Sequence, residues 1–174
     1  MDDEDVLARI REDGALRAAL DLVGDFDVER VDPIEELELP DGERPVPIAG
    51  CASGGTYFLC GPAGTRRPVL YADSEGRATL AAADLAEALT LFTALASWRD
   101  ALDGHPLDEL EEEVRADHPD LDVVRERVRT ALGLSALTPE EARERLRNAA
   151  RRTVPDFLPR PTGHEGHYEP MHSG

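Results

Sequence analysis

The chain has 174 residues, of which 41% are hydrophobic, enough to build one domain around a real core. Its 37 acidic and 19 basic residues give a net charge of −18, which repels phosphate backbones and anionic membranes, so we expect neither nucleic acid nor a membrane as a partner. All 19 basic residues are arginine, and the absence of lysine excludes a Walker-type phosphate loop, a Schiff-base enzyme and a protein kinase.

The start of the chain, "MDDEDVLARI", is acidic where a secretory signal would be basic and then apolar, and no apolar run approaches the ~18 residues of a membrane span. We therefore expect a cytoplasmic protein whose two cysteines, Cys51 and Cys60, are reduced thiols. The composition, rich in alanine and arginine and without lysine, favours a high-GC genome, which we expect to be bacterial.

Apolar residues recur at helical spacing near the N-terminus and predict one broken helix or two short helices over residues 3–23, interrupted at Gly14. Residues 24–43 then mix proline, turn residues and carboxylates. This segment is typical of an acidic connector that holds one short strand or turn.

From Pro45 the pattern becomes that of β-structure. The stretches "PVPIAGCA", "TYFLCG", "RPVLYAD" and "RATLAA" predict four short strands in an antiparallel meander. Gly54 and Gly55 lie in the first connection, where a tight hairpin requires positive φ. We therefore interpret the glycine-rich stretch as a hairpin turn.

Asp84 opens a predicted helix whose apolar stripe runs to Leu102 and should cover one face of the sheet. Further helices are predicted over residues 106–117, 119–133 and 138–152.

The last of these helices begins with Thr138 as the cap, a first-turn proline and Glu141 as the capping-box acid. The tail beyond it, "VPDFLPRPTGHEGHYEPMHSG", has four prolines and almost no periodicity, so we expect it to be largely disordered.

The sequence offers weak candidates for nucleophilic catalysis. A hydrolase elbow requires G-x-S-x-G between a strand and a helix, and Ser53 has neither that spacing nor that context. A nucleophilic Cys51 or Cys60 would need a histidine base, and the histidines lie in helical linkers or in the tail.

Two other groups of side chains were candidates for chemistry. His164, Glu165, His167 and His172 are plausible ligands for a metal, but their spacing and the glycines between them do not form a catalytic zinc helix. Acid pairs such as those in residues 25–27 or 111–113 could serve a glycosidase, but the aromatic lining of a sugar cleft is missing. We therefore expect no cofactor and no metal.

The stretch "PVPIAGCASGGTYFLCG", followed by "RPVLYADSEG" and a helix, resembles the SUKH superfamily of bacterial immunity proteins. The similarity covers about residues 45–102. Its first part is formed by Pro47, Ile48, Ala49, Gly50, Gly54, Gly55, Tyr57, Phe58 and Leu59, and its second part by Val69, Leu70, Tyr71, Asp73 and Glu75.

The resemblance implies an α+β fold with a curved antiparallel sheet, here of about four strands, flanked by helices. The helical periodicity beyond residue 105 adds a helical C-terminal extension. We expect a SUKH-like domain over residues 1–104, a helical extension over 105–155 that packs on or beside it, and a disordered tail over 156–174. The resemblance also implies a non-catalytic protein that neutralises a toxin.

Our leading hypothesis is therefore a protein-binding, antitoxin-like immunity protein whose acidic surface occludes a basic toxin. The acidic excess is greatest in the first 50 residues, so we expect this surface to be formed by Asp25, Asp27, Glu29, Glu35, Glu36 and Glu38.

Two alternatives stay open at this point: a small enzyme that depends on Cys51, Ser53 or a metal held by the tail, and a regulatory scaffold that uses residues 106–152. The sequence does not indicate an oligomeric state.

Overall fold

The computed structural model describes residues 2–33 and 35–172, and over these ranges the protein is an α+β fold. Its helices are α1 (Asp3–Glu12), α2 (Gly14–Gly24), α3 (Leu85–Ala94), α4 (Trp98–Leu102), α5 (Leu107–Asp117), α6 (Leu121–Leu132) and α7 (Pro139–Arg151). Its strands are β1 (Leu37–Glu38), β2 (Val46–Gly50), β3 (Thr56–Leu59), β4 (Val69–Ala72), β5 (Arg77–Ala82), β6 (Arg160–Pro161) and β7 (Glu169–Pro170). None of the helices in the described ranges is long and apolar enough to cross a membrane.

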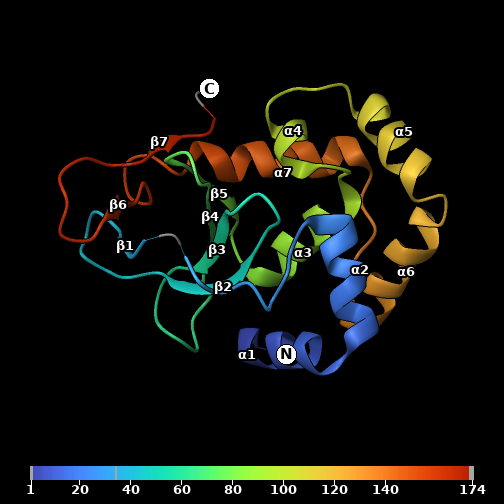
Figure 1. Cartoon of the computed structure of the whole chain (residues 1–174), viewed down its shortest axis with the longest axis horizontal. Coiled ribbons are helices and arrows are strands. Elements are labelled where there is room, and N and C mark those ends of the chain that lie inside the picture. The colour runs from blue at the N-terminus through green and yellow to red at the C-terminus, as the bar shows by residue number, and fades with distance from the viewer. Residues whose placement is uncertain (1, 34, 173–174) are drawn as a thin grey trace.

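The main sheet has the strand order β2-β3-β4-β5-β7. The first four strands form the antiparallel meander that the sequence predicts, and β7 adds a fifth, short strand parallel to β5. β1 and β6 pair with each other in a separate two-stranded sheet. Figure 1 shows this small sheet on one side of the main sheet and most of the helices on the other.

Alternation along the central strands buries both faces of the main sheet, because successive side chains of a strand point to opposite sides. Tyr57 and Leu59 pack into the larger core on the helical side, whereas Phe58 and Cys60 pack into a smaller core with β1 and the tail. Every residue of β3 and β4 is buried. The sheet is therefore the middle layer of the protein.

The helices of the C-terminal extension join the same core. α7 packs on β5, and α6 packs on α2 and α3. The buried Arg125 of α6 donates a hydrogen bond to the carbonyl of Thr93 at 2.8 Å and pairs with Glu111 of α5. This arginine therefore ties α3, α5 and α6 together without leaving a buried charge unpaired.

The single helix predicted from Asp84 to Leu102 is wrong, because the structure breaks it into α3 and α4. Leu95 leaves the helical conformation, and Ser97 adopts the left-handed conformation with φ of 52°. The apolar periodicity continues through the break, since residues on both sides of it are buried. Hydrophobic periodicity therefore cannot predict the break between α3 and α4. The break turns Trp98 toward the sheet, where its indole donates to the Tyr57 hydroxyl.

The tail also differs from the expectation of disorder. Residues 156–172 are described and supply β6 and β7, and the backbone of Glu169 and Met171 donates hydrogen bonds to Gly76 and Ala78 at 2.9 Å. Tyr168 is buried in the smaller core. Two-residue strands are too short to show a periodicity in the sequence. The tail is instead held in place by its hydrogen bonds to the edge of the main sheet and by the burial of Tyr168.

The glycine-rich stretch is a hairpin turn, as predicted. Gly54 has φ of 93°, and the Cys51 amide donates to the Gly55 carbonyl at 3.1 Å. Gly55 has no room for a side chain because a Cβ there would lie 2.1 Å from the Tyr71 hydroxyl. Cys51 and Cys60 pack into cores on opposite faces of the sheet, and both are free thiols.

Candidate functional site

The six carboxylates predicted to form one acidic surface belong to two groups. Asp25, Asp27 and Glu29 follow α2, beside the end of β2. Each pairs with an arginine: Asp25 accepts from Arg99 at 2.6 Å, Asp27 accepts from Arg30 at 3.1 Å, and Glu29 lies 3.6 Å from Arg17.

The other three carboxylates lie at or just before β1 and are also paired. Glu35 accepts a hydrogen bond from the Tyr168 hydroxyl at 2.6 Å. Glu36 lies 3.9 Å from Arg44, and Glu38 accepts from Arg160 at 2.8 Å. Five of these six carboxylates are therefore paired with an arginine and Glu35 is hydrogen-bonded to a tyrosine, which reduces the negative field that the six present to a partner.

A cavity of about 440 Å³ lies where α2 ends and α4 begins, with the Ala52 turn and the α5–α6 junction around it. Asp25 is the one predicted site residue that lines it. The lining is formed by Asp21, Leu22, Val23, Gly24, Asp25, Ala52, Ala96, Ser97, Trp98, Arg99, Asp100, Val114, His118 and Leu121.

Two strained backbone positions face this cavity. Asp25, with φ of 50°, and Ser97, with φ of 52°, are the non-glycine residues with positive φ in the described chain. Such conformations cost about 1–3 kcal/mol each and cluster at functional sites. Asp25 ends α2, and its carboxylate also accepts a hydrogen bond from the Ala52 amide at 3.2 Å.

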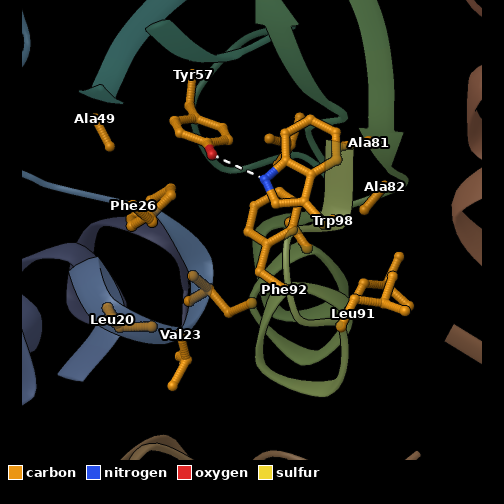
Figure 2. Close-up of a cluster of buried hydrophobic side chains, with 14 of the residues drawn as sticks. Leu20, Val23, Phe26, Ala49, Tyr57, Ala81, Ala82, Leu91, Phe92 and Trp98 are labelled. Atoms are coloured by element: carbon orange, nitrogen blue, oxygen red, sulfur yellow. Dashed lines mark hydrogen bonds between the residues drawn. The ribbon is translucent and has the colours of Figure 1, made fainter. Parts of the chain in front are cut away.

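An aromatic cluster supports the cavity from the sheet side. The indole of Trp98 donates to the Tyr57 hydroxyl at 3.0 Å, and that hydroxyl donates to the Asp25 carbonyl at 3.0 Å. Phe92 stacks on Trp98 with ring centroids 5.0 Å apart, and Phe26 packs on Tyr57. Figure 2 shows Trp98 and Tyr57 meeting between the sheet and the helices. This cluster fixes both strained residues to the core.

Arg99 is the basic side chain of the cavity. Its guanidinium lies 5.2 Å from the ring centre of Tyr71 and 5.7 Å from that of Trp98, within cation–π range. One terminal nitrogen pairs with Asp25, while Nη1 is buried and has no hydrogen-bond partner in the described chain. Arg99 therefore neutralises one carboxylate of the cavity, that of Asp25.

The cavity keeps an excess of negative charge. Asp21 and Asp100 line it and have no ion-pair partner within residues 2–33 and 35–172. Burial raises the pKa of Asp21, and the carboxylates of Asp27 and Asp25 raise it further. Crowding of like charges raises the free energy of the ionised site, so a bound cation would be stabilised there.

Cys51 lies next to this cluster, on the helical side of the sheet. Its Sγ lies 3.1 Å from the Ser53 hydroxyl and 3.3 Å from the Tyr71 hydroxyl. Burial opposes ionisation, yet these two hydrogen bonds and the charge of Arg99 lower the pKa of the thiol. No histidine is among its hydrogen-bond partners in the described residues.

The tail histidines do not come together as a metal site. Among the residues that the structure describes, no group of three or more histidine, cysteine, aspartate or glutamate side chains could hold a metal ion. His167 instead contacts a backbone carbonyl, that of Tyr168, at 2.8 Å.

Sequence reasoning missed most of this cavity. Asp21 and Asp100 lie on two helices, and Ser97, Arg99 and His118 lie at helix ends, so the cavity depends on how these ends meet. The one signal in the sequence was the polar pair Arg99 and Asp100 within an apolar helical stripe.

The chain matches no protein-family model, no curated protein and no solved structure.

Proposed function

We propose that the protein is a non-catalytic binding protein that captures a basic partner protein, with an arginine or lysine side chain of the partner entering the cavity between α2 and α4. This proposal rests on Asp21 and Asp100, two carboxylates that have no ion-pair partner in the described chain. They line one cavity together with two strained backbone positions. A positively charged side chain of the partner would neutralise the negative charge of Asp21 and Asp100, which Arg99 does not neutralise.

The dimensions of the cavity suit a single long side chain. Its volume of about 440 Å³ lies at the lower end of the range for small-ligand sites, about 300–1,000 Å³. The net charge of −18 supports the same class of partner, because complementary charge accelerates the encounter with a basic protein.

The resemblance to SUKH immunity proteins supports a toxin as this partner. In such a complex the acidic protein blocks the groove that a basic toxin uses for its substrate. The paired carboxylates of the connector would then contribute at the rim of the interface, where exposed ion pairs change affinity little.

A hexa-arginine peptide tests the cavity without knowledge of the partner. Isothermal titration calorimetry would compare the unchanged protein with the double variant Asp21→Asn/Asp100→Asn. Because each carboxylate would accept a charge-assisted hydrogen bond from the peptide, we expect binding to weaken by about tenfold or more for the double variant.

The matched control is Asp156→Asn/Glu165→Gln, which removes the same charge from two exposed tail positions. We expect this control to bind the peptide within about twofold of the unchanged protein, since exposed charges act weakly at a distance. Equal weakening in both variants would show that net charge alone attracts the peptide, and the cavity would have no specific role.

Capture from a lysate of the host organism then tests the immunity role. The unchanged protein should retain a basic protein that the cavity variant does not retain, and adding the protein should suppress the toxicity of what is captured. A captured protein that is retained equally by both variants would overturn the proposed site.

A further inference from the structure

A second cavity, of about 390 Å³, lies beside α7, and the charged residues of its lining are three arginines and one glutamate. Arg145, Asn148 and Arg152 line it from α7 and the position just after it. Arg66 joins them from the connection between β3 and β4, and Ala83 and Glu87 line it at the start of α3.

The arginines of α7 differ from most others in the chain because they lack carboxylate partners. Arg143, Arg145, Arg147, Arg151 and Arg152 form no ion pair with any carboxylate in residues 2–33 and 35–172. Most other arginines are ion-paired, as Arg67 is with Asp3. Arg143 and Arg151 donate to the His105 carbonyl and to Asn148, whereas the guanidinium groups of Arg145 and Arg152 have no hydrogen-bond partner in the described chain and can donate to an external anion.

Helical spacing places the α7 side chains of the cavity on one face. Positions 145, 148 and 152 are separated by three and four residues, the spacing that aligns side chains along a helix. Arg66 is held opposite them by Asp84, which accepts from its Nε at 2.9 Å. The terminal nitrogens of Arg66 have no hydrogen-bond partner in the described chain.

The acidic side chain in the lining is already engaged. The Glu87 carboxylate accepts a hydrogen bond from the Ala83 amide at 2.9 Å, and Glu87 lies in the first turn of α3. The positive end of the helix therefore compensates its charge. What remains for a ligand is a set of guanidinium groups and the amide of Asn148, whose Oδ1 accepts a hydrogen bond from Arg151 at 2.7 Å.

We propose that this cavity binds a compact multivalent oxyanion of the phosphate monoester type. A guanidinium presents a planar fork of N–H donors, and several converging forks match the acceptor oxygens of a phosphate. The site is independent of the basic-partner proposal, because its charge is opposite and it shares no lining residue with the acidic cavity.

Inorganic phosphate is the first probe. Thermal unfolding of the full chain would be followed in phosphate and in sodium chloride at equal ionic strength, and calorimetry would give the affinity. We expect phosphate to raise the melting temperature above that in chloride, because a ligand that binds the folded state stabilises it.

The test variant is Arg145→Gln/Arg152→Gln, and the control is Arg9→Gln/Arg127→Gln, which removes two exposed arginines that line neither cavity. We expect phosphate affinity to fall by about tenfold or more in the test variant and to change by less than about twofold in the control. Circular dichroism would verify that both variants are folded.

Three results would overturn the proposal: equal melting temperatures in phosphate and chloride, equal loss of affinity in both double variants, and a response to succinate as large as that to phosphate. The first means that no anion binds, the second that attraction is nonspecific, and the third that the site takes the carboxylates of an acidic segment.

Discussion

The two cavities of this protein carry opposite charges although they lie in one small, strongly acidic molecule. In the cavity between α2 and α4, one arginine is surrounded by carboxylates, and its Nη2 pairs with Asp25 at 2.6 Å. In the cavity beside α7, arginines predominate and the one carboxylate, Glu87, is held by a backbone amide.

This difference shows that net charge does not locate a binding site. The connector around Glu36 and Glu38 has a high density of carboxylates, yet arginines compensate them locally. Asp21 and Asp100 are fewer but unpaired in the described structure, and both line the cavity between α2 and α4 from exposed positions. The balance of ion pairs, which depends on the tertiary structure, decides where charge is available to a partner.

The largest effect should come from Trp98→Ala, which removes the aromatic support of the acidic cavity. Trp98 is 2% exposed and donates to Tyr57, so its loss leaves a large void in the core. We expect the free energy of unfolding to fall by about 3–5 kcal/mol. Because Trp98 is the one tryptophan of the chain, urea unfolding must be followed by circular dichroism.

Val123→Ala is the matched control for this truncation, since Val123 is 63% exposed and should change stability by less than about 0.5 kcal/mol. If Trp98→Ala were no more destabilising than this control, the aromatic cluster would not hold the cavity in shape.

A smaller effect is expected from Arg99→Gln, which leaves Asp25 unpaired beside Asp21. We expect stability to fall by about 1–3 kcal/mol, because a partly buried carboxylate loses its charged donor. The same change should strengthen hexa-arginine binding, since the cavity gains negative charge. Arg44→Gln, whose pair with Glu36 is exposed and outside the cavity, should show neither change. Weaker peptide binding to Arg99→Gln than to the unchanged protein would contradict the role of negative charge in the cavity.

The stability of the protein should also depend on the ionisation of Asp21. The pKa of Asp21 is raised in the folded protein, first by burial and then by Asp27 and Asp25. The folded state therefore holds this proton more tightly than the unfolded state, and the ionised group opposes folding as pH rises through its folded pKa.

Asp21→Asn removes that penalty. We expect the melting temperature of the variant to exceed that of the unchanged protein near neutral pH, and the two to converge as the pH is lowered to roughly 3, where the carboxyl is protonated in both states. A difference in melting temperature that stayed constant over this range would show that burial and the neighbouring carboxylates do not raise the pKa of Asp21.

The smallest effect should distinguish the two cysteines, one on each face of the sheet. Hydrogen bonds and Arg99 outweigh burial and lower the pKa of Cys51, whereas burial, aided by nearby carboxylates, raises the pKa of Cys60 to about 12. We expect iodoacetamide to modify Cys51 first at mildly alkaline pH, because the thiolate is the nucleophile. Peptide mapping would show which cysteine is modified first, and Cys51→Ala should remove the faster phase of modification. Equal rates of modification at Cys51 and Cys60 would contradict this prediction.

Much of the fold followed from local patterns. Short runs of β-branched and aromatic residues between turn signals, such as "TYFL" and "VLYA", predicted the central strands. The Thr138–Glu141 capping box predicted the start of α7, where both hydrogen bonds are present. These signals lie within a few residues of one another, so the chain specifies them before any long-range contact forms.

The candidate sites were harder to predict for a physical reason. Asp25 was expected to be exposed to a partner, but its arginine lies 74 positions away in sequence. The Tyr168 hydroxyl that engages Glu35 comes from a tail whose composition favoured disorder. Such pairings depend on which surfaces the core brings together, and no short-range pattern records them.

The sequence by itself determined the α+β class, the four-stranded meander, the hairpin at Gly54 and the three C-terminal helices, because hydrophobic periodicity and turn chemistry act locally. The tertiary structure alone decided the break at Ser97, the strand added by the tail, and the long-range ion pairs of the connector, such as Asp25 with Arg99 and Glu38 with Arg160. Ion pairs and strained backbone need support from distant segments, so both cavities exist only once the helices have packed on the sheet.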